Sequence, residues 1–351
     1  MAKSTKMEEE KYMRRCIELA KNGLCNVSPN PMVGAVIVCD GRIIGEGYHI
    51  RCGEAHAEVN AIRSVKDESL LKRSTIYVSL EPCSHYGKTP PCADLIIEKQ
   101  IPRIVIGCQD PFSEVAGRGI QKLRDAGREV TVGVLEEECK SLIRRFITFN
   151  TLHRPFITLK WAESADHFID IERTDGKPVV LSSPLTSMLV HKKRAEADAI
   201  MVGRRTALLD NPSLTVRNWY GHNPIRVVLD RTLFLPNDLQ IFDGNVPTFI
   251  FTEKQQAEKK NITYITINFS HNPLKQIMEA LYQRKIQSLL VEGGRQLLQS
   301  FIDNELWDEA YIEKCPSRLH SGVKAPQMDD NFSYSIEEHF ERQIWHYVRR
   351  I

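Results

Sequence analysis

The fold of the first half of the chain is decided by VGAVIVCDGRIIGEGYHIRCGEAHAE, residues 33–58. A β-rich run reaches Cys39, and the Asp40-Gly41 pair that follows is typical of a tight hairpin turn. A second β-type run continues from this turn, and helical spacing begins near Ala55. Strand and helix patterns then alternate as far as residue 150. The sequence therefore predicts a three-layer α/β domain.

A second domain is predicted beyond the polar, proline-containing joint at residues 151–155. Strand-type runs such as FITLKWA (156–162) and SLLVEGG (288–294) recur there, with helical patterns between them. This alternation predicts another α/β domain, and 351 residues is an ordinary length for two domains. The predicted division is therefore 1–150 and 151–351.

The overall charge and the cysteine count limit the partners and the compartment that we expect for this protein. Lys and Arg total 47 against 45 Asp and Glu, which gives no support to a nucleic-acid or membrane-surface role. No apolar run has the roughly 18 residues of a transmembrane helix, and the start of the chain lacks the apolar core of a signal peptide. Nine cysteines, an odd number, argue against a disulfide framework. We expect a cytoplasmic protein without a nucleic-acid or membrane partner.

The segments HAE (56–58), EPC (81–83) and PPC (90–92) carry the chemistry of the first domain. One histidine and two cysteines are the ligand set of a catalytic zinc, which keeps its fourth position for water. This pattern predicts zinc ligands at His56, Cys83 and Cys92. Zinc lowers the pKa of its water toward about 7, and Glu58, in the first turn of a helix, can move the proton without binding the metal. The order of these segments is that of zinc nucleobase deaminases, although the spacing between the cysteines is wider.

Other interpretations of these residues remain open. A structural zinc, or a zinc-stabilised interaction module, would need one more Cys or His ligand and would be indifferent to Glu58→Gln. A nucleic-acid base deaminase would favour a basic strand-binding face and only two residues between the cysteines.

Four segments resemble the bifunctional deaminase/reductase family of riboflavin biosynthesis: SPNPMVGAVIV (28–38), GEGYHIRCGEAHAE (45–58), EPCSHYGKTPPC (81–92) and QDPFSEVAGRGI (109–120). The resemblance implies a cytidine-deaminase-like fold and hydrolytic deamination of 2,5-diamino-6-(5-phosphoribosylamino)pyrimidin-4-one. It also implies substrate contacts at Asn30, His49, His85, Lys88 and Asp110. Phe112 stands where the family usually has Asn, and its side chain lacks the amide that would hydrogen-bond the substrate.

The second domain resembles the reductase domain of the same family over AEADAIMVGRRTALLDNPSLTVR (195–217), PIRVVLD (224–230) and LVEGG (290–294). The resemblance implies a dihydrofolate-reductase-like fold and NADPH-dependent reduction of the ribosyl group to ribityl. The implied cofactor contacts are Ala162, Thr206, Asp210, Gly293, Gly294, Arg295, Gln296 and Leu297. The implied substrate contacts are Arg194, Leu214, Arg217 and Glu292, with the arginines suited to bidentate binding of the 5'-phosphate. Family members are often dimers or tetramers, so self-association is expected.

Several positions of this second domain depart from the family pattern, including PSRLHSG (316–322), which is looser than the usual Pro-x-Leu-Leu-Gly. Residues 164–167 are Ser-Ala-Asp-His where the family usually has Ser-Leu-Asp-Gly, and residues 178–182 are Pro-Val-Val-Leu-Ser where it has Ser-Gln-Trp-Ile-Thr. The missing Trp could have packed on the nicotinamide, so a degenerate, non-reducing second domain is an alternative. Arg231 replaces a small polar residue, and we hypothesise that it pairs with the 2'-phosphate of NADPH.

Overall fold

The computed structural model describes residues 5–84, 90–111, 116–173, 177–329 and 332–349. The chain divides into two compact units, Met1–His153 and Arg154–Ile351. Across the described residues, no helix is both long enough and apolar enough to span a bilayer.

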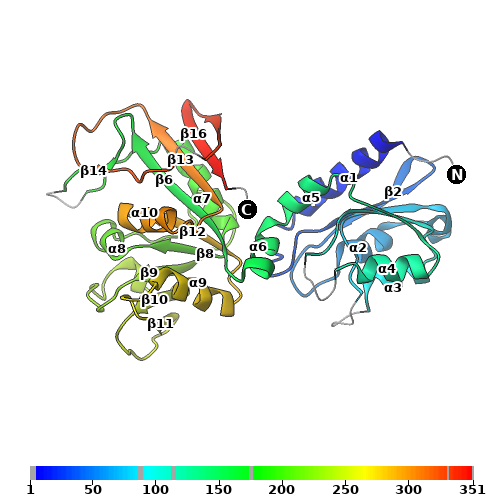
Figure 1. Ribbon diagram of the computed structural model, residues 1–351, viewed down its shortest axis with the longest axis horizontal. Coiled ribbons are helices and arrows are strands. Elements are labelled where there is room, and N and C mark those ends of the chain that lie inside the picture. The colour runs from blue at the N-terminus through cyan, green and yellow to red at the C-terminus, as the bar shows by residue number, and fades with distance from the viewer. Residues whose placement is uncertain (1–4, 85–89, 112–115, 174–176, 330–331, 350–351) are drawn as a thin grey trace. The chain divides into compact units, whose positions relative to one another are not determined.

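The first unit, coloured from blue to green in Figure 1, is built on a five-stranded sheet with the order β2-β1-β3-β4-β5. The strands are β1 (Gly34–Cys39), β2 (Arg42–Tyr48), β3 (Thr75–Leu80), β4 (Arg103–Cys108) and β5 (Glu129–Val132). The predicted β1–β2 hairpin is confirmed: Asp40 and Gly41 both have positive φ, as a two-residue turn of this kind requires. β3, β4 and β5 are parallel, so their carboxyl ends lie at one edge of the sheet.

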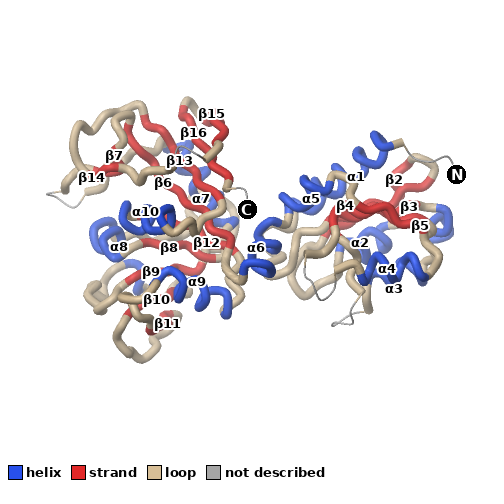
Figure 2. The backbone as a smooth tube through the Cα atoms, in the orientation of Figure 1, coloured by secondary structure: helices blue, strands red, loops and turns tan. Residues whose placement is uncertain are grey.

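Helices cover both faces of this sheet, so the predicted three layers are confirmed (Figure 2). Alternate strand residues divide between two cores; Ile76 and Val78 of β3 enter one, and Tyr77 enters the other. The helices α2 (Ala57–Ser64), α3 (Cys92–Glu98) and α4 (Arg118–Asp125) pack on the first core. On the opposite core lie α1 (Lys6–Lys21) and α5 (Glu136–Leu142), while η1 (Glu68–Arg73) and α6 (Arg144–Leu152) complete the unit.

The second unit contains a nine-stranded sheet with the order β11-β10-β9-β8-β12-β6-β13-β16-β15. Its strands are β6 (Phe156–Ser164), β8 (Ala199–Val202), β9 (Ile225–Leu229), β10 (Thr248–Thr252), β11 (Ile262–Thr266), β12 (Ser288–Gly293), β13 (Glu309–Cys315), β15 (Tyr334–His339) and β16 (Arg342–Val348). In this spatial order, the strands from β11 at one edge through to β13 are all parallel to one another. β15 and β16 form an antiparallel hairpin at the other edge. A separate pair joins β7 (Phe168–Asp170) to β14 (Val323–Lys324).

The faces of this sheet bury two further cores. Ala199 and Met201 face one core with α9 (Pro273–Gln283) and α10 (Arg295–Asp303), while Ile200 faces the other with α8 (Arg204–Asp210). The remaining helices are α7 (Pro184–Glu196) and η2 (Gln240–Phe242). Because β8 and β12 are neighbouring parallel strands, the loops that follow them meet at one edge of the sheet.

Candidate metal centre and cofactor cavity

Three side chains with metal-binding atoms meet in the first unit. His56 is the N-cap residue of α2, Cys92 is the first residue of α3, and Cys83 lies in the loop after β3. The His56 Nδ1 atom is 3.6 Å from the Cys83 sulfur and 3.3 Å from the Cys92 sulfur. The structure thus brings together the three residues that the sequence predicted as zinc ligands.

This cluster has the dimensions of a tetrahedral zinc site. Zinc–sulfur bonds of about 2.3 Å and zinc–nitrogen bonds of about 2.05 Å would place nitrogen and sulfur about 3.6 Å apart. The Cys92 backbone N–H donates to the Cys83 sulfur, and hydrogen bonding from the Cys92 and His56 side chains lowers the pKa of Cys83, which favours the thiolate that zinc binds. No fourth Cys or His joins the cluster within the described residues, as a catalytic site with an open position requires.

Glu58 lies beside these ligands in the first turn of α2. Its side chain is only 3% exposed, and this burial raises the pKa of its carboxyl to about 7. The Cys92 thiol hydrogen-bonds the same carboxyl group. A buried carboxyl group beside these ligands, with a pKa near neutrality, can both take up and release a proton.

Asn30 and His49, two predicted substrate residues, form a pair next to the metal ligands. His49 Nδ1 lies 3.1 Å from the Ala55 carbonyl oxygen, which assigns the ring proton to Nδ1 and makes Nε2 the acceptor for the Asn30 amide at 3.1 Å. Burial lowers the pKa of His49, so the ring stays neutral near pH 7. The His49 and His56 rings meet edge to face, with centroids 5.5 Å apart. The backbone N–H of Asp110 bonds to Glu81, and His85, Lys88 and Phe112 lie outside the described residues.

A cavity of about 930 Å³ opens in the second unit where β8 and β12 end. All eight predicted cofactor residues line it: Ala162, Thr206, Asp210, Gly293, Gly294, Arg295, Gln296 and Leu297. Of the four predicted substrate residues, only Glu292 is among its lining residues.

Two helices begin at the wall of this cavity. The N-cap residues of α8 and α10 are Gly203 and Gly294, and neither provides a side-chain cap for the first N–H groups. Uncapped helix N-termini bind phosphate through these N–H groups and the helix dipole. Arg204 and Arg205, which the sequence analysis did not single out, add positive charge to the same wall. The cavity therefore fits a ligand that carries several phosphate groups, and NADPH is such a ligand.

Charged groups gather around Glu292 at this cavity. The guanidinium of Arg194 makes a bidentate ion pair with it, at 2.8 and 2.6 Å, and donates to the Thr215 carbonyl oxygen. The bidentate edge of Arg194 is thus used to hold Glu292 rather than presented to a phosphate. Lys160 on β6 also lines the cavity, and loss of hydration lowers its pKa even though Glu292 and Glu313 are close by. Lys160 is a candidate functional residue that the sequence analysis missed.

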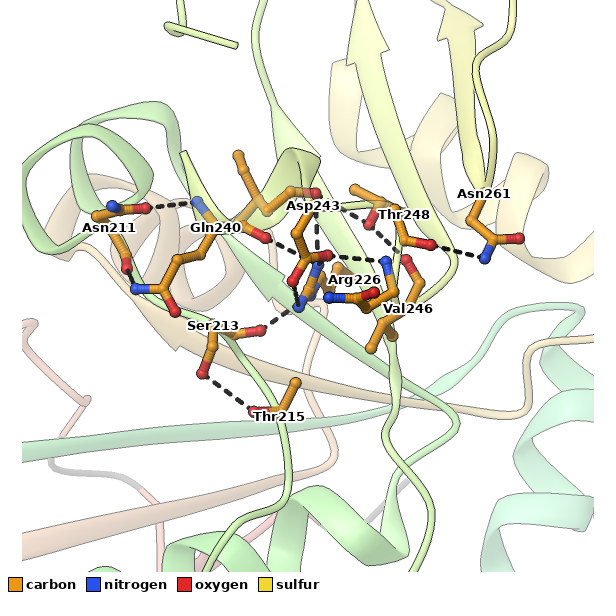
Figure 3. A network of polar contacts seen from close by, with 12 residues as sticks. Asn211, Ser213, Thr215, Arg226, Gln240, Asp243, Val246, Thr248 and Asn261 are labelled. Atoms are coloured by element: carbon orange, nitrogen blue, oxygen red, sulfur yellow. Dashed lines mark hydrogen bonds and ion pairs between the residues drawn. The ribbon is translucent and has the colours of Figure 1, made fainter. Parts of the chain in front are cut away.

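The predicted substrate residues Leu214 and Arg217 lie in a loop that side chains from outside it hold in place. Figure 3 shows the fully buried Arg226 of β9 between this loop and η2. Arg226 donates to the Ser213 carbonyl oxygen and makes a bidentate pair with Asp243. Gln240 and Asn211 exchange two further hydrogen bonds of 2.7 Å (Figure 3). Arg217 itself is exposed and lines a second cavity of about 590 Å³, where its charge can meet a phosphate.

The departures from the family pattern are accommodated in the structure. Asp166 accepts hydrogen bonds from Ser164 and from the backbone of Leu319 and His320, so the turn after β6 is anchored. His167 adopts the left-handed conformation, φ +64°, that glycine favours, and its ring contacts Glu163 at 2.8 Å. Val180 lines the cofactor cavity but is 83% exposed, so it leaves open the space that a larger Trp would cover.

Comparison with known proteins agrees with both sites. The family model of the cytidine and deoxycytidylate deaminase zinc-binding region matches residues 6–108, and that of the RibD C-terminal domain matches residues 155–319. The riboflavin biosynthesis protein RibD of Aquifex aeolicus is 38% identical over 94% of this chain and 92% of its own length. This chain belongs to the RibD family. RibD of Bacillus amyloliquefaciens is 39% identical over 91% of this chain and 87% of its own length.

Solved structures of RibD proteins have the same fold. The deaminase/reductase of Thermotoga maritima, with 39% identity, superposes with a TM-score of 0.88 over 98% of this chain and 99% of its own. RibD of Acinetobacter baumannii, with 30% identity, gives 0.88 over the same shares. These findings confirm the predicted family and fold class, a cytidine-deaminase-like α/β domain followed by a reductase-like α/β domain. They also support the expected zinc, since the matched deaminase region is a zinc-binding one.

Proposed function

We propose that the chain catalyses two consecutive steps of riboflavin synthesis, the first on 2,5-diamino-6-(5-phosphoribosylamino)pyrimidin-4-one. One observation carries the proposal: the same chain contains the His56–Cys83–Cys92 cluster beside Glu58 and a cavity suited to a ligand with several phosphates. When bound, zinc supplies a Lewis acid that acidifies water, and NADPH supplies a hydride. We assign zinc binding to the cluster and NADPH binding to the cavity.

In the first reaction, Glu58 moves the protons. It takes a proton from the attacking water and delivers it to the ring amine. The oxygen of water forms a bond to the ring carbon, the carbon–nitrogen bond breaks, and ammonia leaves. Asn30 can donate to and accept from the edge of the pyrimidine ring, and the neutral His49 fixes its orientation.

In the second reaction, the uracil product is reduced at C1 of its sugar. The bond between C1 and the ring oxygen breaks as C1 gains the hydride, and the oxygen takes a proton to give the ribityl chain. We assign Lys160 as the donor of this proton and Arg217 as the ligand of the 5'-phosphate. Arg194 acts on Glu292, which it holds toward the cavity.

The rival function is a deaminase with a non-reducing second domain, which the changes at 164–167 and 178–182 motivate. We test it by presenting the deaminated product and NADPH to the purified chain and following NADPH oxidation. The proposal expects steady turnover and a product that has gained two hydrogen atoms. NADPH that binds but is not oxidised would support the rival instead.

The 2'-phosphate of NADPH is assigned to Arg231, which lines the cavity and pairs with Glu253 at 2.8 Å. A hydrogen bond to a charged group is worth about 1.5–3 kcal/mol, so Arg231→Ala should lower the preference for NADPH over NADH about tenfold or more. Steady-state kinetics with both cofactors measure this ratio. An unchanged ratio in Arg231→Ala, with a fall in Arg204→Ala, would move the assignment to α8.

The substrate is a small phosphorylated pyrimidine, and no nucleic acid or membrane takes part. The odd number of cysteines, nine, supports a cytoplasmic location. Exposed apolar side chains on the β15–β16 hairpin, including Tyr334, Ile336 and Phe340, support self-association as a dimer or tetramer. Sedimentation of the purified chain measures its oligomeric state.

A further inference from the structure

The carboxylate of Glu81 accepts hydrogen bonds from four backbone N–H groups at the edge of the deaminase site. Its side chain is buried, with the residue 6% exposed. Oε2 accepts from Asp110 at 3.2 Å and from Gly117 at 3.0 Å. Oε1 accepts from Gly119 at 2.9 Å and from Ile120 at 3.2 Å. One buried side chain therefore satisfies donors from both ends of the segment that follows β4.

These bonds replace a helix cap that the local sequence lacks. The N-cap residue of α4 is Gly117, which has no side chain to accept from the first turn. The N–H groups of Gly119 and Ile120 belong to that turn and have no partner within the helix. Glu81 supplies the acceptor from another part of the chain, and its negative charge lies at the positive end of the helix.

Backbone contact between the same two segments is close. A Cβ atom on Gly119 would lie 2.1 Å from the carbonyl oxygen of Pro82, so only glycine permits this approach. The Glu81 N–H also donates to the Cys108 carbonyl oxygen at 3.0 Å, which ties the end of β3 to the end of β4. The loop that carries Cys83 and the segment that carries Asp110 are therefore fixed against each other through Glu81.

We propose that Glu81 is a positioning residue of the deaminase, which sets the distance between the metal ligand Cys83 and the substrate residue Asp110. The inference rests on the proposed deamination. Glu81 touches neither the substrate nor the metal in this assignment. It acts through its hydrogen bond to the Asp110 backbone and through the backbone that joins it to Cys83.

Glu81→Gln tests the proposal with little change in shape. The amide keeps one acceptor oxygen but turns an NH₂ group toward two N–H donors, which it cannot satisfy. A displacement of about 1 Å at a reacting site can cost about 10²-fold, so kcat/KM for amine release should fall by that order, mainly through a higher KM. Zinc content should stay at the wild-type level, because all three ligands remain. The matched control is Glu98→Gln, at an exposed position of α3, which should behave as wild type.

The reductase activity of the same chain is a second control. NADPH oxidation with the deaminated product should be unchanged in Glu81→Gln. Gly119→Ala provides an independent route, because the added methyl group must push α4 away from Pro82 and should likewise raise KM for amine release. Should Glu81→Gln fail to fold, Gly119→Ala decides the question. Wild-type KM in the folded variants, or a loss of activity that follows loss of zinc, would overturn the positioning role. Absence of amine release from the wild-type chain would instead refute the proposed function itself.

Discussion

Glu58→Gln is expected to lower kcat for amine release by about 10³-fold, within the range of general acid–base catalysis. The amide has nearly the same size as the buried carboxyl group but cannot take a proton from water and pass it on. Because Glu58 is not one of the three clustered ligands, the variant should keep its zinc. Metal analysis and ammonia release, measured on the same preparation, check both parts.

The control for this variant is again Glu98→Gln, which changes the same functional group on the exposed side of α3. A Glu58→Gln protein that keeps its zinc and releases ammonia at the wild-type rate would contradict the proton-transfer role. That result would assign the proton transfer to another group near the metal ligands. Loss of zinc from the variant would show that Glu58 supports the metal site rather than the chemistry.

Lys160→Met should lower kcat for NADPH oxidation by about 10²-fold or more, since it removes the assigned proton donor. Amine release should be unchanged, because Lys160 belongs to the second unit. Burial lowers the pKa of Lys160 below the ordinary lysine value, so wild-type turnover should decline as alkaline pH deprotonates the amine. Lys160→Met should lack that alkaline decline. If Lys160 were merely structural, the decline would remain in the variant.

The control is Lys275→Met, at an exposed position of α9, which should keep both the rate and the alkaline decline. An alkaline limb that survives in Lys160→Met would assign the proton to another group. Wild-type kcat in Lys160→Met would remove Lys160 from the mechanism altogether. Each outcome is read from one pH series of NADPH oxidation with the deaminated product.

Features set by neighbouring residues could be predicted from the sequence. The Asp40-Gly41 turn fixes the first hairpin, and alternating apolar residues place β3 between two helical layers. His56 and Glu58 could be assigned because a helix start fixes the spacing between a ligand and a proton carrier. β5 ends at Val132 because Gly133 takes a positive φ, which breaks the extended chain.

Features that depend on distant partners could not be predicted. Arg194 was expected to bind phosphate, but its bidentate partner is Glu292, 98 residues later in the chain. Arg226 can be fully buried because Asp243 and three carbonyl oxygens accept its hydrogen bonds, and a single arginine in a strand gives no sign of these partners. In the sequence, Glu81 only begins the EPC segment, and its four donors come from a segment beyond β4. Spacing along the chain carries no information about such contacts.

The central claim is that one chain performs a hydrolytic and then a reductive step on the same phosphorylated pyrimidine. The most direct test incubates the zinc-loaded wild-type chain with the diaminopyrimidinone and follows the pyrimidine by mass spectrometry, first without NADPH and then with it. The account predicts exchange of one amino group for oxygen before NADPH is added, and a gain of two hydrogen atoms afterwards. An exchanged product that stays unreduced while NADPH is present, or a substrate that is not deaminated at all, would contradict it.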